Sequence, residues 1–233
     1  MRRIVDILVA SFALILLSPI LVVVAIAVMV SSAGGPFYRG LRVGLNGKPF
    51  RMWKFRTMHE DAHHYGPITG PNDARVFPLG RVLRRTKIDE LPQFINLLLG
   101  DMTLVGPRPE SPGMVELYKP WHLAVLSVKP GITGPVQIET VEEADIIPVG
   151  VDPAAFYVEH LMDYKIQLYL DHMDNRTFWG DTKVVVSTIG LILHAAFGFP
   201  WAPKRRALPT VPPETPHHDY TLAGSVSSPD NRR

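Results

Sequence analysis

The longest hydrophobic stretch of the chain lies near its start. Residues 7–30 carry no charge, and only Ser11, Ser18 and Pro19 interrupt the run of apolar side chains. About 20 apolar residues are enough for a helix to cross the hydrocarbon core of a bilayer. The pattern therefore predicts a membrane-embedded helix within residues 1–35.

Two alternatives to this interpretation start from the same residues. A cleaved signal peptide would use the basic start, Arg2 and Arg3, and a cleavage site at residues 25–27 (Ala-Ile-Ala). The apolar run continues past that site and is too long for a signal peptide. The second alternative is an ordinary spanning helix with a proline kink. The charges on the two sides of the segment help to distinguish a spanning helix from one that turns back.

Basic residues flank the hydrophobic segment on both sides. Arg2 and Arg3 precede it. Residues 36–58 hold six basic residues and no acidic one: Arg39, Arg42, Lys48, Arg51, Lys54 and Arg56. Because basic flanks stay in the cytoplasm, we expect the segment to enter the membrane and turn back, with both termini cytoplasmic. Pro19 interrupts helical hydrogen bonding and Ser18 can bind a freed carbonyl, so this pair is the expected re-entrant break.

The residues around Asn46-Gly47 predict a β-hairpin. This dipeptide favours a tight turn, and it separates residues 37–43 from residues 50–56. The period of two places Lys54 and Arg56 on one face of the second strand. Two cations on one face suit a diphosphate or lipid phosphate, and they equally suit a basic surface resting on anionic lipid. The pattern alone leaves both interpretations open.

Apolar residues at helical spacing surround two adjacent carboxylates, Asp89 and Glu90. A new helix is expected to begin at or near Pro92 and to stop at Gly100. The carboxylates then lie just before a helix N-terminus, which favours anions. They also follow four basic residues: Arg81, Arg84, Arg85 and Lys87. As bare chemistry the arrangement fits capping and ion pairing, or a nucleophile and metal ligand acting on a phosphate.

A stiff turn follows a short strand predicted at residues 102–105. Arg108 lies between Pro107 and Pro109, and proline restricts the backbone on both sides of it. A guanidinium held in this way is suited to bidentate phosphate binding. A plain turn without a ligand is the alternative.

Two helices and a tail are expected in the C-terminal part. Residues 156–170 place apolar side chains on one helical face, which predicts packing into a core. Residues 184–199 form an apolar run that is short for a membrane span, and they are interpreted as an interfacial or core helix. Residues 202–233 are rich in Pro, Ser and Thr and are expected to be disordered.

The composition narrows the class of protein. The chain has 233 residues, 46% hydrophobic and 20% charged, with a net charge of +2, which excludes wholesale disorder, collagen and coiled coils. The sequence contains no cysteine, which excludes disulfide scaffolds, thiolate metal sites and cysteine nucleophiles. It has no nucleotide fingerprint such as a P-loop, and we expect no nucleic-acid partner. We predict an α+β fold with a re-entrant helix at 1–35, a cytoplasmic domain with interfacial helices at 36–201 and a tail at 202–233.

A series of short motifs runs in order from residue 2 to about residue 192. The motifs are Arg2-Arg3-Ile4-Val5-Asp6, Ser18-Pro19, Lys54-Phe55-Arg56-Thr57-Met58, Ile88-Asp89-Glu90-Leu91-Pro92-Gln93 with Asn96, Gly100-Asp101-Met102, Val105-Gly106-Pro107-Arg108-Pro109 and Lys129-Pro130-Gly131-Ile132-Thr133-Gly134. In this order and spacing they resemble the bacterial sugar transferases, which are monotopic phosphoglycosyl transferases that begin polyprenyl-linked glycan assembly.

The resemblance implies a role for several residues. Ser18-Pro19 would lie in a re-entrant membrane helix, and Asp89 with Glu90 would form the catalytic dyad. Mg²⁺ would be the cofactor, with Asp89 as its ligand. The candidates for binding substrate phosphates are Lys54, Arg56 and Arg108 with its flanking Pro107 and Pro109.

The implied reaction transfers a sugar-1-phosphate from a UDP-sugar to undecaprenyl (polyprenyl) phosphate. UMP would leave, and Asp89 would carry a covalent phosphosugar intermediate. The enzyme would act at the cytoplasmic face of the inner membrane, in contact with its lipids, and would initiate exopolysaccharide, O-antigen or glycoconjugate assembly. The alternatives are a membrane-anchored glycosyl transferase that releases UDP and an inactive membrane scaffold.

Overall fold

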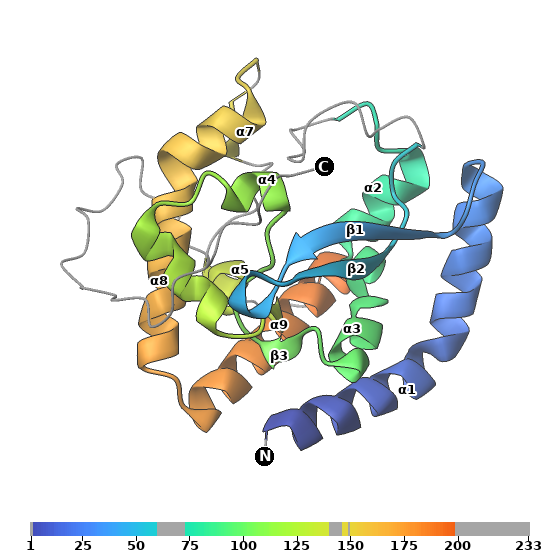
Figure 1. Cartoon of the computed structure of the whole chain (residues 1–233). Helices are drawn as coiled ribbons and strands as arrows, with labels where there is room; N and C mark the ends of the chain where they lie inside the picture. The colour runs from blue at the N-terminus through green and yellow to red at the C-terminus, as the bar shows by residue number, and fades with distance from the viewer. Residues whose placement is uncertain (1, 60–72, 140–145, 149, 199–233) are drawn as a thin grey trace, which may run out of the picture.

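The N-terminal hydrophobic segment forms one helix, α1 (Arg2–Ser31), in a computed structural model that describes residues 2–59, 73–139, 146–148 and 150–198. The helix continues through Pro19 and curves along one side of the molecule (Figure 1). The Ser18 hydroxyl donates to the carbonyl of Ile15 at 2.8 Å, as expected beside a proline. Among the described helices, α1 alone is long and apolar enough to cross a membrane.

The first turn of α1 is bound to the rest of the chain. Arg3 donates to the carbonyls of Leu97 and Leu98, at 2.6 and 2.7 Å. The buried carboxylate of Asp6 accepts hydrogen bonds from the Thr103 hydroxyl and the Leu104 amide. These partners come from the end of one helix and the strand that follows it, so the start of α1 is fixed to that connection.

The last turns of α1 are bound to the same folded domain. Val28 is fully buried in a small core with Phe55, Phe77 and Leu83. Ser32, just beyond the helix, accepts from the guanidinium of Arg56 at its hydroxyl and its carbonyl. Both ends of the long apolar helix are therefore held by one domain.

The predicted hairpin is confirmed. β1 (Phe37–Val43) and β2 (Pro49–Phe55) are antiparallel, and a short 3-10 turn, η1 (Leu45–Gly47), joins them. Asn46 and Gly47 have φ of 55° and 75°, the left-handed values that the Asn-Gly pair tolerates. The pairing ends at Phe55, so Arg56 lies just outside the strand that the sequence predicts for it.

The next elements carry the carboxylate pair. The order is α2 (Pro78–Arg85), η3 (Ile88–Glu90), α3 (Gln93–Leu99) and β3 (Thr103–Val105). Pro92 caps the start of α3, and Gly100, with φ of 93°, ends it, as the sequence predicts. The pair lies in η3, immediately before α3.

A second, two-stranded sheet joins two sequence motifs that are far apart in the chain. β3 pairs in parallel with β4 (Gly131–Thr133). A Cβ on Gly131 would lie 2.1 Å from the amide nitrogen of Gly106, so only glycine permits this approach. The turn that carries Arg108 is thereby packed against the loop that begins β4.

Helices complete the α+β fold (Figure 1). Their bounds are α4 (Pro112–Val115), η4 (Pro120–Ser127), α5 (Pro135–Glu139), α7 (Pro153–Phe156), η5 (Tyr157–Leu161), α8 (Met162–Asp174) and α9 (Phe178–Phe197). The predicted helix 156–170 is present, with a π-helical turn at η5. The main core holds residues from α4, η4, α5, η5 and α8: Met114, Val125, Val136, Tyr157, Leu161, Met162, Ile166, Tyr169 and Leu170. The tail predicted at 202–233 lies outside the described residues.

Candidate active site

Glu90 is the meeting point of two cations from different parts of the fold. Lys54, on β2, donates to Oε1 at 2.8 Å. Arg108, on the turn after β3, donates to Oε1 at 2.7 Å and to Oε2 at 3.3 Å. Burial would raise the pKa of Glu90, but the charges of Arg108 and Lys54 hold that pKa well below its ordinary range. Glu90 is thus a buried carboxylate that orients two cations.

Asp89 has a different environment from its neighbour. Its side chain is 5% exposed, and its Oδ1 atom has no hydrogen-bond partner within the described part of the chain. Burial and the charge of Glu90 raise its pKa to about 6, and the nearby cations Lys54, Lys87 and Arg84 oppose the shift. A buried carboxylate oxygen without a partner is available to attack a substrate or to bind a metal.

Lys54 is one of the residues that the sequence predicts to bind substrate phosphate. Burial lowers its pKa, and the adjacent Glu90 carboxylate acts in the opposite direction. The Lys54 ammonium is thus held in an ion pair with one carboxylate of the dyad. Lys54 and Arg108 are brought together by Glu90, as the phosphate-binding hypothesis requires.

Arg56 is not brought to this cluster. Its guanidinium is buried and donates to the Gly35 carbonyl at 2.7 Å and to the hydroxyl and carbonyl of Ser32 at 2.9 and 2.7 Å. The alternation that places Lys54 and Arg56 on one strand face ends with β2 at Phe55. Arg56 fixes the chain that leaves α1, and this geometry does not support its predicted contact with phosphate.

Asn96 connects the helix after the dyad to the strand that bears Lys54. Its amide oxygen accepts from the Trp53 amide at 2.9 Å, and its nitrogen donates to the Arg51 carbonyl at 2.8 Å. The same nitrogen donates to the Asp101 carboxylate at 3.0 Å. Because Asn96 is fully buried, these bonds hold α3 and β2 in one relative position. In the sequence, Asn96 is noted only as part of a family motif, and the pattern does not predict these contacts.

The Arg108 turn is supported from behind by groups that the sequence patterns do not single out. Arg176 donates to the carbonyl of Val105 at 2.6 Å and is itself paired with Asp181. Glu110 accepts from the Tyr157 hydroxyl at 2.8 Å. These contacts join the turn to α9 and to the main core. No local pattern reveals them, since the partners are distant in the chain.

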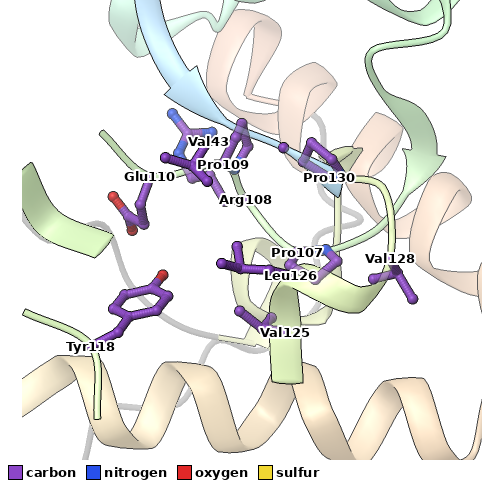
Figure 2. Close-up of a pocket in the computed structure, with 11 residues that line it drawn as sticks. Val43, Pro107, Arg108, Pro109, Glu110, Tyr118, Val125, Leu126, Val128 and Pro130 are labelled. Atoms are coloured by element: carbon purple, nitrogen blue, oxygen red, sulfur yellow. The ribbon is translucent and has the colours of Figure 1, made fainter. Parts of the chain in front are cut away.

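A small pocket adjoins the Arg108 turn. Its walls are mostly apolar and are formed by β1, the turn itself and η4: Val43, Gly44, Pro107, Arg108, Pro109, Glu110, Tyr118, Val125, Leu126, Val128 and Pro130. Figure 2 shows the Glu110 carboxylate and the Tyr118 hydroxyl on the same side of this space. Pro107 and Pro109 contribute shape to the turn and offer no donor to a phosphate.

The metal hypothesis can be examined on the same residues. Within the described residues there is no group of three or more His, Asp or Glu side chains arranged to hold a metal ion. Mg²⁺ commonly binds through one or two carboxylates together with substrate phosphates. The unpartnered Oδ1 of Asp89 fits that role. The oxygens of Glu90 are already occupied by Lys54 and Arg108.

The fold and site define a recognisable class: an α+β domain with an apolar N-terminal helix and a buried carboxylate pair set among cations suited to phosphate. The chain belongs to the bacterial sugar transferase family, whose profile matches residues 1–195. The family resemblance inferred from the sequence motifs is confirmed.

Named relatives agree with this assignment. The uncharacterized sugar transferase EpsL of Bacillus subtilis is 34% identical over 194 residues, which cover 83% of this chain and 87% of that protein. A UDP-glucose:undecaprenyl-phosphate glucose-1-phosphate transferase of Caulobacter vibrioides is 35% identical over 198 residues, covering 82% and 69%. The protein of that name from Escherichia coli is 37% identical over 205 residues, covering 84% and 41%. The chain thus spans about two fifths of the length of the Escherichia coli relative.

Proposed function

We propose that this protein transfers a sugar-1-phosphate from a UDP-sugar to undecaprenyl phosphate and releases UMP. The observation that carries the proposal is the buried Asp89 with its unpartnered oxygen, next to a Glu90 that orients Lys54 and Arg108. The names of the relatives, which specify UDP-glucose or UDP-N-acetylgalactosamine and undecaprenyl phosphate, support the substrate class. The product would start the assembly of a bacterial polysaccharide.

The proposed chemistry has two displacement steps at phosphorus. An oxygen of Asp89 attacks the phosphorus that bears the sugar, the bond to the UMP oxygen breaks, and UMP leaves with the electron pair. An oxygen of undecaprenyl phosphate then attacks the same phosphorus, and the bond to Asp89 breaks. The product is an undecaprenyl diphosphosugar, and the Asp89 carboxylate is regenerated.

The surrounding cations would reduce the electrostatic repulsion that this reaction has to overcome. A carboxylate that approaches a diphosphate is repelled, and charge accumulates on the phosphoryl oxygens in the transition state. Arg108 and Lys54 point donors toward the dyad and would bind those oxygens, with Glu90 keeping both cations in place. Mg²⁺, when bound by Asp89 and substrate phosphates, would supply further neutralising charge.

We also propose that α1 is re-entrant and that both termini lie on the cytoplasmic side of the inner membrane. A straight 30-residue helix would be about 45 Å long, well beyond the apolar core of a bilayer. Contacts at Asp6 and Val28 tie its two ends to one domain, which supports a helix that enters and leaves at the same surface. Most of its large apolar side chains are exposed and are thereby available to lipid.

The covalent step is tested with labelled donor and no lipid acceptor. UDP-glucose and UDP-N-acetylgalactosamine carrying label in the sugar phosphate are each incubated with the protein and Mg²⁺. Label is expected on the protein, with UMP released in equal amount. Asp89→Asn should show neither, whereas Asp171→Asn, on the exposed side of α8, should behave like the wild type.

The same assay separates the alternatives. Release of UDP in place of UMP would indicate a glycosyl transferase that delivers the sugar without its phosphate. Turnover that requires the lipid and never labels the protein would mean direct displacement, with Asp89 only a metal ligand. The absence of any release with the tested donors and undecaprenyl phosphate would favour a scaffold.

A further inference from the structure

Arg42 lies on the face of the hairpin that bears Lys54. Cross-strand partners share a face, and Tyr38 is opposite Lys54, while Arg42 follows Tyr38 by four residues on the same strand. Arg39 has the opposite parity, and its guanidinium lies 4.5 Å from the centre of the Trp53 ring on the other face. The strand register therefore separates two arginines that the sequence groups as one basic patch.

Within the described part of the chain, the Arg42 side chain makes no hydrogen bond or ion pair with another residue. Its Nε atom is buried and makes no hydrogen bond, and no ion pair joins the side chain to another described residue. The nearby carboxylates are engaged elsewhere. Glu110 accepts from Tyr157, and Glu90 accepts from Lys54 and Arg108. A buried hydrogen-bond donor without an acceptor is destabilising. An anion from outside the chain would supply the missing acceptor.

The charges that act on Arg42 include those of Arg108 and Glu90 in the candidate site. Burial lowers its pKa, the carboxylate of Glu110 opposes that shift, and the charge of Arg108 adds to it. The Tyr38 hydroxyl and Glu90 also act on it. Gly40 lies between Tyr38 and Arg42 on this face, and a Cβ there would meet the Tyr38 ring at 2.8 Å. The missing side chain leaves room for the ring beside the arginine.

We propose that Arg42 contacts substrate and, with Lys54 and Arg108, forms a cradle for a phosphate group. This inference rests on the proposed function and extends its binding site. With the Glu90 and Asp89 carboxylates both ionised, these three cations leave a net charge of about +1, which attracts the doubly negative diphosphate of a nucleoside diphosphate sugar. Arginine suits the position because its fork of N–H donors binds phosphoryl oxygens in pairs.

The phosphate can come from the donor or from the lipid acceptor, and the kinetic arms distinguish these sources. Arg42→Gln is compared with Arg39→Gln, a matched neutralisation on the opposite face of the same strand. Loss of UMP release without acceptor would identify the donor phosphate as the ligand. Normal labelling with a raised KM for undecaprenyl phosphate would identify the acceptor phosphate. In either arm we expect kcat/KM to fall about ten- to hundredfold in Arg42→Gln and to change less than about twofold in Arg39→Gln.

A binding measurement makes the test independent of turnover. Calorimetric titration of the full chain with UDP and with inorganic pyrophosphate should show weaker binding for Arg42→Gln than for Arg39→Gln. If wild-type protein binds but never releases UMP, the proposed function fails and the role of Arg42 stands. Equal affinities and equal kinetics for the two variants would overturn the inference.

A third variant guards against misfolding. Arg42→Lys keeps the charge but removes the paired donors, so it should fold and should recover part of the lost affinity. If Arg42→Gln does not fold, Arg42→Lys is compared with Arg39→Lys in the same titrations. Indistinguishable binding by those two proteins would also overturn the inference.

Discussion

Arg108 and Glu90, 18 residues apart in the chain, meet through two hydrogen bonds, 2.7 Å to Oε1 and 3.3 Å to Oε2. Lys54 donates to the same Oε1 from a different element. The two adjacent carboxylates therefore have different roles. Glu90 holds cations in position, and the neighbouring Asp89 keeps an oxygen without a partner.

Glu90→Gln is expected to lower turnover at least about tenfold, because Lys54 and Arg108 lose the anion that orients them. Added Mg²⁺ should not restore the rate, since the side chain positions cations and does not bind the metal. The measurement is UMP release as a function of Mg²⁺ concentration, with the exposed Glu116→Gln as control. Full recovery at high Mg²⁺ would assign Glu90 to the metal site.

Replacing Ser18 and Pro19 with leucine should convert α1 from a re-entrant to a spanning helix, because leucine at position 19 restores the backbone hydrogen bond that proline cannot make and so favours a straight helix. The sequence contains no cysteine, so single cysteines placed at Arg2 and Gly35 report their side of the membrane without background. With Ser18 and Pro19 intact, both single cysteines should react only after the cytoplasmic side is opened. In the double leucine variant the two sites should differ. Labelling from outside at either site, while Ser18 and Pro19 are intact, would contradict re-entry.

Asn96→Ala should destabilise the protein by about 1–3 kcal/mol, because it leaves the Trp53 amide and the Arg51 carbonyl without partners. Turnover should fall as well, since the relative position of α3 and β2 sets the distance between Glu90 and Lys54. Thermal unfolding in detergent and UMP release are measured together. A variant that loses neither stability nor activity would show that the fold holds this contact by other means.

His122 makes the stability of the fold sensitive to acid. Its buried ring accepts from the Lys119 amide at Nδ1, which leaves the proton on Nε2, 3.0 Å from the Asp163 carboxylate. Burial lowers its pKa, although Asp163 opposes the shift. In the unfolded chain this histidine binds a proton near pH 6.5, whereas the folded chain binds it only at lower pH. The free energy of unfolding is therefore highest above this pH and decreases as the pH falls below it.

His122→Gln removes this titration. Between about pH 7.5 and 5.5 the melting temperature of the wild type should fall more steeply than that of His122→Gln. Lys119 pairs with Asp163 as well, so Asp163→Asn is a useful second variant. Parallel pH profiles for wild type and His122→Gln would show that another group controls acid stability.

Local patterns in the sequence predicted several of the elements and the family. The apolar run predicts α1, Asn46-Gly47 predicts the hairpin turn, and the pair of Pro92 and Gly100 marks the ends of α3. Each of these signals acts within a few residues, through capping, backbone restriction or hydrophobic spacing. The helix start expected at Pro92 put Asp89 and Glu90 just before a helix, and they lie there, in η3.

Which side chains meet was decided by tertiary structure alone. Lys54 and Arg56 look alike in the sequence, yet Lys54 reaches Glu90 while Arg56 binds the residues that follow α1, because β2 ends between them. Arg39 and Arg42 form one basic patch in the sequence, and strand register sends them to opposite faces. Contacts between distant residues depend on how whole elements pack, and no short-range preference of the chain encodes that packing.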